Sequence, residues 1–171
     1  THEMKIFDGY LLCTDLDDTL LTTDKKISGA NENAIKYFMS EGGKFAYATG
    51  RVPDGLAHYI NQLTPNVPII CYNGAGIYDI ESKKYLMRDM LAPGAADVLD
   101  YIHESFDFAG IEVVTENTIY ASVINNRVRE HINFERLEFK EEDYHKIPEP
   151  WIKALFMRII SEYTTGLSIA I

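Results

Sequence analysis

The first 72 residues alternate between short apolar runs and amphipathic segments, and this alternation limits the folds that the chain can adopt. Apolar runs at residues 10–14, 44–48 and 67–72 are typical of strands, and the first is consistent with burial on both faces. Between them, residues 30–40 and 53–63 have the apolar spacing or the early proline of helices. Strands that alternate with helices over so short a stretch require crossovers and a parallel sheet. We therefore expect a Rossmann-like α/β unit.

The pattern changes in the second half of the chain. We expect strands at 77–80 and 85–90, a helix at 93–106, a hairpin within 111–124, a helix at 126–137 and a strand at 151–160. This order is typical of an α+β layer and not of a further parallel sheet. We place the boundary near Ser82 and predict two domains, residues 1–81 and residues 82–171.

Charge and composition limit the partners and the compartment. The net charge is −10, spread over both halves, which argues against a nucleic-acid partner because phosphate backbones need a basic stripe. No apolar run approaches the roughly 20 residues that span a bilayer, so we expect no membrane partner and a cytoplasmic protein. Cys13 and Cys71 lie in apolar runs and are predicted to be reduced core thiols.

Three carboxylates, Asp15, Asp17 and Asp18, directly follow the first predicted strand. They would lie at the carboxyl edge of the sheet, where open α/β sheets bind ligands. Carboxylates this close repel one another unless a cation is present, and Mg²⁺ prefers oxygen ligands of this kind. Without the strand in front of it, the segment would be interpreted as a solvated acidic turn or as a helix cap formed by Asp18.

The next two strands end in groups that suit a phosphoryl ligand. Thr49, Gly50 and Arg51 supply a hydroxyl, a close backbone approach and a fixed cation, and Asn73 and Gly74 follow the third strand. Each stretch by itself is typical of an ordinary turn. Together they favour a site, because all three are expected at one edge of one sheet.

These stretches resemble the haloacid dehalogenase (HAD) superfamily. Asp-Leu-Asp-Asp-Thr-Leu-Leu at 15–21, Ala-Thr-Gly-Arg at 48–51 and Asn-Gly-Ala at 73–75 are most similar to the Cof-type sugar-phosphate phosphatases of subfamily IIB. The resemblance implies a Rossmann-like HAD core with an inserted α+β cap domain. It also implies a Mg²⁺-dependent phosphatase that hydrolyses small phosphorylated metabolites, such as sugar phosphates, through an aspartyl-phosphate.

The resemblance also implies roles for individual residues. Asp15 would be the nucleophile and Asp17 the general acid and base, and Mg²⁺ would be held by the Asp15 carboxylate and the Asp17 backbone carbonyl. Thr49 would bind the transferring phosphoryl group. The remaining residues expected to bind substrate or phosphate are Gly50, Arg51, Asn73 and Gly74.

The resemblance does not extend to the family's later motifs. The family carries a lysine beyond the cap and an acidic Gly-Asp motif, but here Lys153 lies in a strand pattern similar to the cap itself. We therefore expect a chain that ends within the cap, with an incomplete core sheet whose exposed edge favours self-association. The alternative function is a non-catalytic fragment, or a phosphate- and metal-binding module, with little hydrolysis of p-nitrophenyl phosphate.

Overall fold

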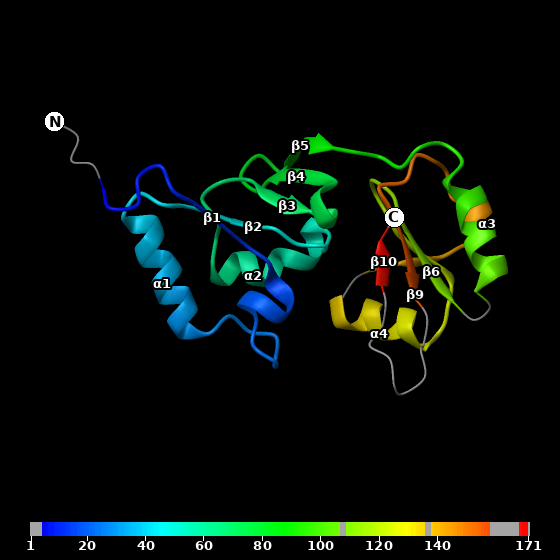
Figure 1. The fold of residues 1–171 in the computed structure, drawn as a ribbon, viewed down its shortest axis with the longest axis horizontal. Coiled ribbons are helices and arrows are strands. Elements are labelled where there is room, and N and C mark those ends of the chain that lie inside the picture. Colours follow the sequence, from blue (N-terminus) through cyan, green and yellow to red (C-terminus); the bar gives the residue numbers. More distant parts are fainter. Residues whose placement is uncertain (1–4, 107–108, 136–137, 158–167, 171) are drawn as a thin grey trace. The chain divides into compact units, whose positions relative to one another are not determined.

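The computed structural model describes residues 5–106, 109–135, 138–157 and 168–170. The chain divides into two compact units, Thr1–Arg88 and Asp89–Ile171 (Figure 1). The division falls after the predicted position near Ser82, because residues 84–88 pair with the preceding strand and stay in the first unit. That the second unit is a cap domain stays a prediction. In the parts of the chain that are described, no helix has the length and apolarity to cross a membrane.

The first unit contains a mixed sheet. Its strands are β1 (Leu11–Thr14), β2 (Lys44–Tyr47), β3 (Ile69–Cys71), β4 (Gly76–Asp79) and β5 (Lys84–Arg88). β1 and β2 are parallel, and a parallel bridge between Ala48 and Ile70 joins β2 to β3. β3, β4 and β5 then run antiparallel to their neighbours. The predicted α/β class with a parallel Rossmann-like part is therefore confirmed.

Two helices supply the rest of the first unit's core. α1 (Gly29–Ser40) begins where the Ser28 hydroxyl accepts a hydrogen bond from the Asn31 N–H. α2 (Ala57–Gln62) follows a 3₁₀ turn (Pro53–Leu56) with proline in its first turn. The central side chains of this core are Leu16, Phe45, Tyr47, Leu56, Leu63 and Ile69.

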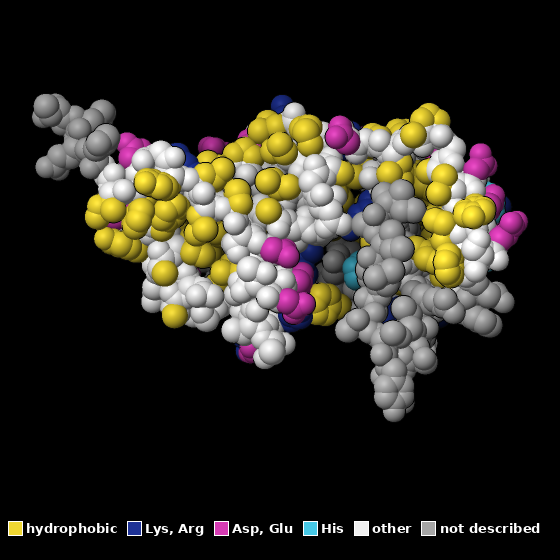
Figure 2. Space-filling model, viewed as in Figure 1, with side chains coloured by type: hydrophobic (Ala, Val, Ile, Leu, Met, Phe, Trp, Pro, Cys, Tyr) yellow, Lys and Arg dark blue, Asp and Glu magenta, His cyan; other side chains and the backbone are white. Residues whose placement is uncertain are grey.

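β1 is more exposed than its sequence predicts. Leu11 is 61% exposed and Leu12 and Cys13 are exposed too, so the predicted burial of this strand and of the Cys13 thiol is wrong. A strand needs neighbours on both edges and cover on both faces to be buried, and among the described residues β1 pairs with β2 alone. Figure 2 shows hydrophobic side chains on the surface of this unit. Self-association through this edge stays a prediction.

The second cysteine behaves as expected. Cys71 is buried on β3, and burial raises the pKa of its thiol to about 12, so the thiol stays protonated at neutral pH.

The second unit has an α+β arrangement, as predicted. Its strands are β6 (Gly110–Val114), β7 (Ile119–Val123), β8 (Lys140–Glu141), β9 (Lys153–Met157) and β10 (Ser168–Ala170), in the order β10-β9-β6-β7-β8. Its helices are α3 (Ala95–Ser105) and α4 (Asn126–Glu135). Trp151 packs in a core with Leu99, Ile111 and Val113. Of the predicted strand 151–160, residues 158–160 lie outside the described residues.

His145 joins α3 to the segment before β9 and is expected to titrate above its usual range. Its Nδ1 lies 2.8 Å from Asp143 Oδ1 and its Nε2 lies 2.8 Å from Asp100 Oδ1. These carboxylates, Asp143 first, raise the pKa of His145, so the contact contributes stability at low pH and loses it as the pH rises through the raised pKa. An NMR titration of Asp143→Asn should show a lower His145 pKa than in the wild type. The control is Asp97→Asn, a carboxylate of α3 outside this contact, which should leave the His145 pKa unchanged. An unchanged His145 pKa in Asp143→Asn would contradict the contact.

Candidate active site

The polar groups that follow β2 and β3 lie against one another. The Thr49 N–H donates to the Ile70 carbonyl over 3.0 Å, and the Asn73 N–H donates to the Thr49 carbonyl over 3.1 Å. Tyr72 and Asn73 both have left-handed backbone, with φ of 54° and 56°, which turns the chain back toward Thr49. The structure thus brings together the second and third predicted stretches at the ends of their strands.

Gly50 makes this close approach possible. A Cβ atom added at Gly50 would meet the Asn73 Oδ1 atom at a separation that real Cβ atoms do not show. We expect Gly50→Ala to push the exposed Asn73 side chain aside and to lower the free energy of unfolding by about 1 kcal/mol or less in a denaturant titration. In an Asn73→Ala background the same change should cost clearly less. An equal cost in both backgrounds would show that the two residues do not compete for this space.

The acidic segment after β1 forms a tight turn over Leu16–Leu20, closed by a hydrogen bond of 2.9 Å from the Leu21 N–H to the Leu16 carbonyl. Within it the Asp17 backbone is extended and the Asp18 backbone is left-handed. Leu16 and Leu20 are buried in the core and fix the turn, whereas the Asp15 side chain is exposed at its start. Asp15 Oδ1 accepts a hydrogen bond of 2.7 Å from the Leu16 N–H, which sets the direction of the carboxylate. The turn therefore presents the predicted nucleophile to solvent from a rigid base.

Asp17 is held by two cations. Its carboxylate accepts hydrogen bonds from Arg51 Nε (2.9 Å) and Arg51 Nη2 (3.0 Å), one on each oxygen, and from Lys25 Nζ (3.2 Å). Partial burial by itself would raise the pKa of Asp17, but the bonds and charges of Arg51 and Lys25 outweigh it and hold that pKa below its usual range. Asp17 is therefore a carboxylate in this geometry.

Arg51 is fixed by its surroundings. Its side chain is only 5% exposed, and its guanidinium lies 5.4 Å from the centroid of the Tyr59 ring on α2. The Arg51 N–H donates to the buried Thr49 hydroxyl over 3.2 Å, which leaves the hydroxyl hydrogen able to donate to a ligand. Arg51, predicted to bind substrate, is thus directed at Asp17.

Sequence reasoning missed Lys25. It lies outside all three motifs, in the turn that follows the acidic segment, and reaches Asp17 only because that turn folds back. The turn is closed by a bridge between Leu21 and Ile27, and the Lys25 backbone is left-handed with φ of 58°. A charged residue in a turn next to an acidic motif is a weak signal, since surface lysines are common in turns.

The donors expected for Mg²⁺ fit that ion in kind. Mg²⁺ in proteins keeps several waters and uses one or two carboxylates, and the exposed Asp15 carboxylate and the Asp17 backbone carbonyl offer oxygen ligands. Because the Asp17 side chain is bound by Arg51 and Lys25, its backbone carbonyl is the Asp17 oxygen that would bind the ion. Among the residues that the structure describes, no cluster of three or more His, Cys, Asp or Glu side chains is placed to hold a metal.

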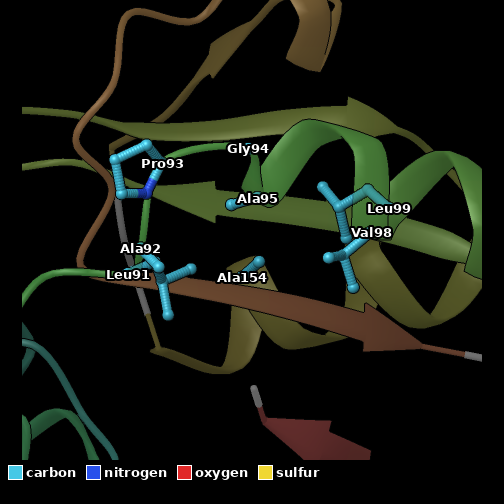
Figure 3. Close-up of a pocket in the computed structure, with 8 residues that line it drawn as sticks. All are labelled: Leu91, Ala92, Pro93, Gly94, Ala95, Val98, Leu99 and Ala154. Atoms are coloured by element: carbon cyan, nitrogen blue, oxygen red, sulfur yellow. The ribbon is translucent and has the colours of Figure 1, made fainter.

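A cavity in the second unit has a different character. It has a volume of about 150 Å³ and lies between the segment before α3, the first turns of α3 and β9 (Figure 3). The residues that line it are Leu91, Ala92, Pro93, Gly94, Ala95, Val98, Leu99 and Ala154. These side chains are apolar and carry no cation, so they offer nothing to a phosphoryl group.

Comparison with known proteins places this arrangement in a family. A family model described as haloacid dehalogenase-like hydrolase matches residues 12–165. The chain belongs to the haloacid dehalogenase-like hydrolase family. The predicted resemblance to HAD proteins is therefore confirmed, and the carboxylate, hydroxyl and amide groups described above lie in the matched residues of this HAD chain.

Two curated relatives are phosphatases of Bacillus subtilis (strain 168). The HAD chain is 31% identical to Phosphatase YwpJ over 111 residues, which cover 64% of this chain and 38% of YwpJ. It is 25% identical to 5-amino-6-(5-phospho-D-ribitylamino)uracil phosphatase YitU over 156 residues, which cover 78% of this chain and 57% of YitU. The chain therefore spans about half the length of these relatives.

Solved structures share the fold. A haloacid dehalogenase-like hydrolase from B. subtilis matches with a TM-score of 0.73 at 20% identity, covering 89% of this chain and 62% of its own. One from Bacteroides thetaiotaomicron matches with a TM-score of 0.72 at 23% identity, covering 87% of this chain and 58% of its own. The HAD subclass IIB sugar phosphatase BT4131 gives a TM-score of 0.72 at 18% identity, covering 86% of this chain and 58% of its own. These likenesses support the HAD-like α/β fold.

Proposed function

We propose that this HAD-family chain carries the nucleophile end of a Mg²⁺-dependent phosphatase that hydrolyses small phosphorylated metabolites such as sugar phosphates. One observation carries the proposal. The carboxylate of Asp15 is exposed at the start of a rigid turn, two residues before Asp17, whose carboxylate is held by Arg51. A nucleophile beside a second, separately controlled carboxylate is what hydrolysis through a covalent intermediate requires.

The reaction proceeds in two steps. An Asp15 oxygen attacks phosphorus, the bond from phosphorus to the ester oxygen breaks, and Asp17 gives its proton to that oxygen. Water then attacks the phosphorus of the aspartyl-phosphate, Asp17 takes the water's proton, and the bond to Asp15 breaks to release inorganic phosphate. When bound by Asp15 and the Asp17 carbonyl, Mg²⁺ would offset the negative charge shared by the carboxylate and the phosphoryl oxygens.

Asp17 has to exist in both protonation states for this sequence. Its pairing with Arg51 and Lys25 favours the carboxylate, which is the form that accepts the water's proton. A phosphate dianion near the two cations opposes their effect and favours the protonated form that the first step needs. Thr49, whose hydroxyl already accepts the Arg51 N–H, would donate its hydrogen to a phosphoryl oxygen.

The relatives support the substrate class. YwpJ and YitU are named as phosphatases, and YitU by its name acts on a phosphorylated small molecule. BT4131, which shares the fold, is named as a sugar phosphatase. We propose a sugar phosphate or a similar metabolite for this chain by that analogy.

A phosphate-release assay tests the proposal. The purified protein is incubated with p-nitrophenyl phosphate and a panel of sugar phosphates, with Mg²⁺, with EDTA, and with EDTA followed by excess Mg²⁺. We expect hydrolysis with Mg²⁺, its loss in EDTA and its return on adding Mg²⁺, because the carboxylate and phosphoryl charges need a cation between them. Binding of Mg²⁺ and phosphate without turnover, or turnover indifferent to EDTA, would overturn the proposal.

A further inference from the structure

The two cations on Asp17 differ in how firmly they are held. The Arg51 side chain is 5% exposed and binds both Asp17 oxygens through its planar fork. The Lys25 side chain is 32% exposed and contacts Asp17 Oδ1 at 3.2 Å, with Asp18 Oδ1 farther away at 3.8 Å. Arg51 is thus the fixed partner of Asp17, and Lys25 is the partner on the solvent side.

The backbone under Lys25 is well fixed even though its side chain reaches toward solvent. The Lys25 N–H donates to the Thr22 carbonyl over 2.9 Å, and the Tyr59 hydroxyl donates to the Lys25 carbonyl over 3.4 Å. A lysine in left-handed backbone costs conformational energy, which these contacts offset. The flexible four-carbon stem allows the ammonium group to move by a few bond rotations while its base stays in place.

Binding of a phosphate near Asp15 adds negative charge, which a cation that can move toward the ligand would offset. Three carboxyl groups, those of Asp15, Asp17 and Asp18, lie in this turn, against the two cations Arg51 and Lys25. A phosphate monoester brings up to two more negative charges to Asp15. Arg51 binds both Asp17 oxygens through its Nε and Nη2 atoms and its side chain is only 5% exposed, whereas the Lys25 side chain is 32% exposed. Lys25 is therefore the cation of this pair that turns more readily toward a ligand in solvent.

Resting on the proposed function, we propose that Lys25 is a phosphate-binding residue of this site. Its ammonium group moves from Asp17 Oδ1 to an oxygen of the substrate's phosphoryl group when the substrate binds. Arg51 keeps Asp17 in place during this exchange. Lys25 thereby offsets part of the phosphate's negative charge and leaves Asp17 with one neighbouring cation in place of two.

Three variants test the role of Lys25. Lys25→Met removes the charge at similar length, and Lys25→Arg restores a cation. Lys26→Met is the matched control, because Lys26 is the exposed neighbour whose side chain pairs with Asp24 at 3.0 Å. The affinity for inorganic phosphate is measured calorimetrically in the presence of Mg²⁺, together with kcat and KM for p-nitrophenyl phosphate and the thermal unfolding midpoint.

We expect Lys25→Met to weaken phosphate binding by about tenfold or more, which corresponds to about 1.4 kcal/mol, and to raise KM by a similar factor. Lys25→Arg should recover most of the affinity, and Lys26→Met should bind as the wild type does. If Lys25→Met fails to fold, Lys25→Gln takes its place.

The outcomes separate this inference from the function on which it rests. If the wild type hydrolyses the ester and Lys25→Met binds phosphate as tightly as the wild type, the proposed role of Lys25 is wrong and the phosphatase proposal is unaffected. An equal loss in Lys26→Met also overturns the role of Lys25, because the effect would then be one of general charge. A wild-type protein that neither binds phosphate nor hydrolyses the ester overturns both.

Discussion

Replacement of Asp15 by asparagine is expected to abolish phosphatase turnover, by three or more orders of magnitude on the scale seen when other enzymes lose their nucleophile. The amide has the shape of the carboxylate but cannot form the acyl-phosphate bond. Its oxygen can still accept the hydrogen bond from the Leu16 N–H, so the turn should keep its shape. Steady-state phosphate release gives the activity, and circular dichroism with thermal unfolding confirms that the variant is folded.

Asp18→Asn is the matched control for this change. The Asp18 side chain is 97% exposed and its backbone is left-handed with φ of 56°, a conformation that asparagine adopts readily. We expect its turnover to stay within a few-fold of the wild type. Substantial hydrolysis by Asp15→Asn, or an equal loss in both variants, would show that Asp15 is not the attacking group.

Replacement of Arg51 by methionine is expected to lower turnover by about 10²-fold, in the range of general acid–base contributions, and to destabilise the first unit. Asp17 is partly buried and would lose the guanidinium bonds on both of its oxygens. Loss of one partner of a fully buried pair costs about 3–5 kcal/mol, so for this partly exposed carboxylate we expect about 2 kcal/mol in the free energy of unfolding. Urea titrations at neutral pH measure it.

The pH dependence of that loss has a definite sign. The folded-state pKa of Asp17 lies below its usual range, so the pairing stabilises the folded protein above the usual aspartate pKa. This contribution disappears as the pH falls through the lowered pKa. The difference between Arg51→Met and the wild type should therefore be largest at neutral pH and shrink in strong acid.

Two controls complete the experiment. Arg127→Met removes an exposed arginine paired with Glu130 at 2.9 Å, and should change the stability by less than about 0.5 kcal/mol. Asp17→Asn combined with Arg51→Met should cost less than the two single changes added together, because both remove the same interaction. Strict additivity would contradict a direct pairing between them.

The meeting of the polar groups at the ends of β2 and β3 could be predicted from the sequence. Thr49 and Asn73 each follow an apolar run, and the carboxyl ends of adjacent strands meet whatever the loops between them do. The family could be predicted for the same reason, since its motifs are short and lie at those ends.

The side-chain pairing could not be predicted in this way. Arg51 lies 34 residues beyond Asp17 in the sequence. Whether its guanidinium binds that carboxylate or a ligand depends on its side-chain rotamer and on its contact with the Tyr59 ring. Lys25 depends on a turn whose left-handed residue is not glycine, so the usual sequence signal is missing. The exposure of β1 was missed because an apolar run indicates a strand without indicating what covers it.

Tyr59, on α2, contacts both residues whose cations bind Asp17, although it lies outside the three sequence motifs. Its ring lies under the Arg51 guanidinium and its hydroxyl holds the Lys25 carbonyl, so one side chain supports both cations by two separable means. Loss of the hydroxyl alone would loosen the turn that carries Lys25 and leave the surface beneath Arg51 intact. Loss of the ring would release both. On the roles proposed for Lys25 and Asp17, Tyr59→Phe would therefore affect phosphate binding alone, whereas loss of the whole ring would affect both phosphate binding and proton transfer.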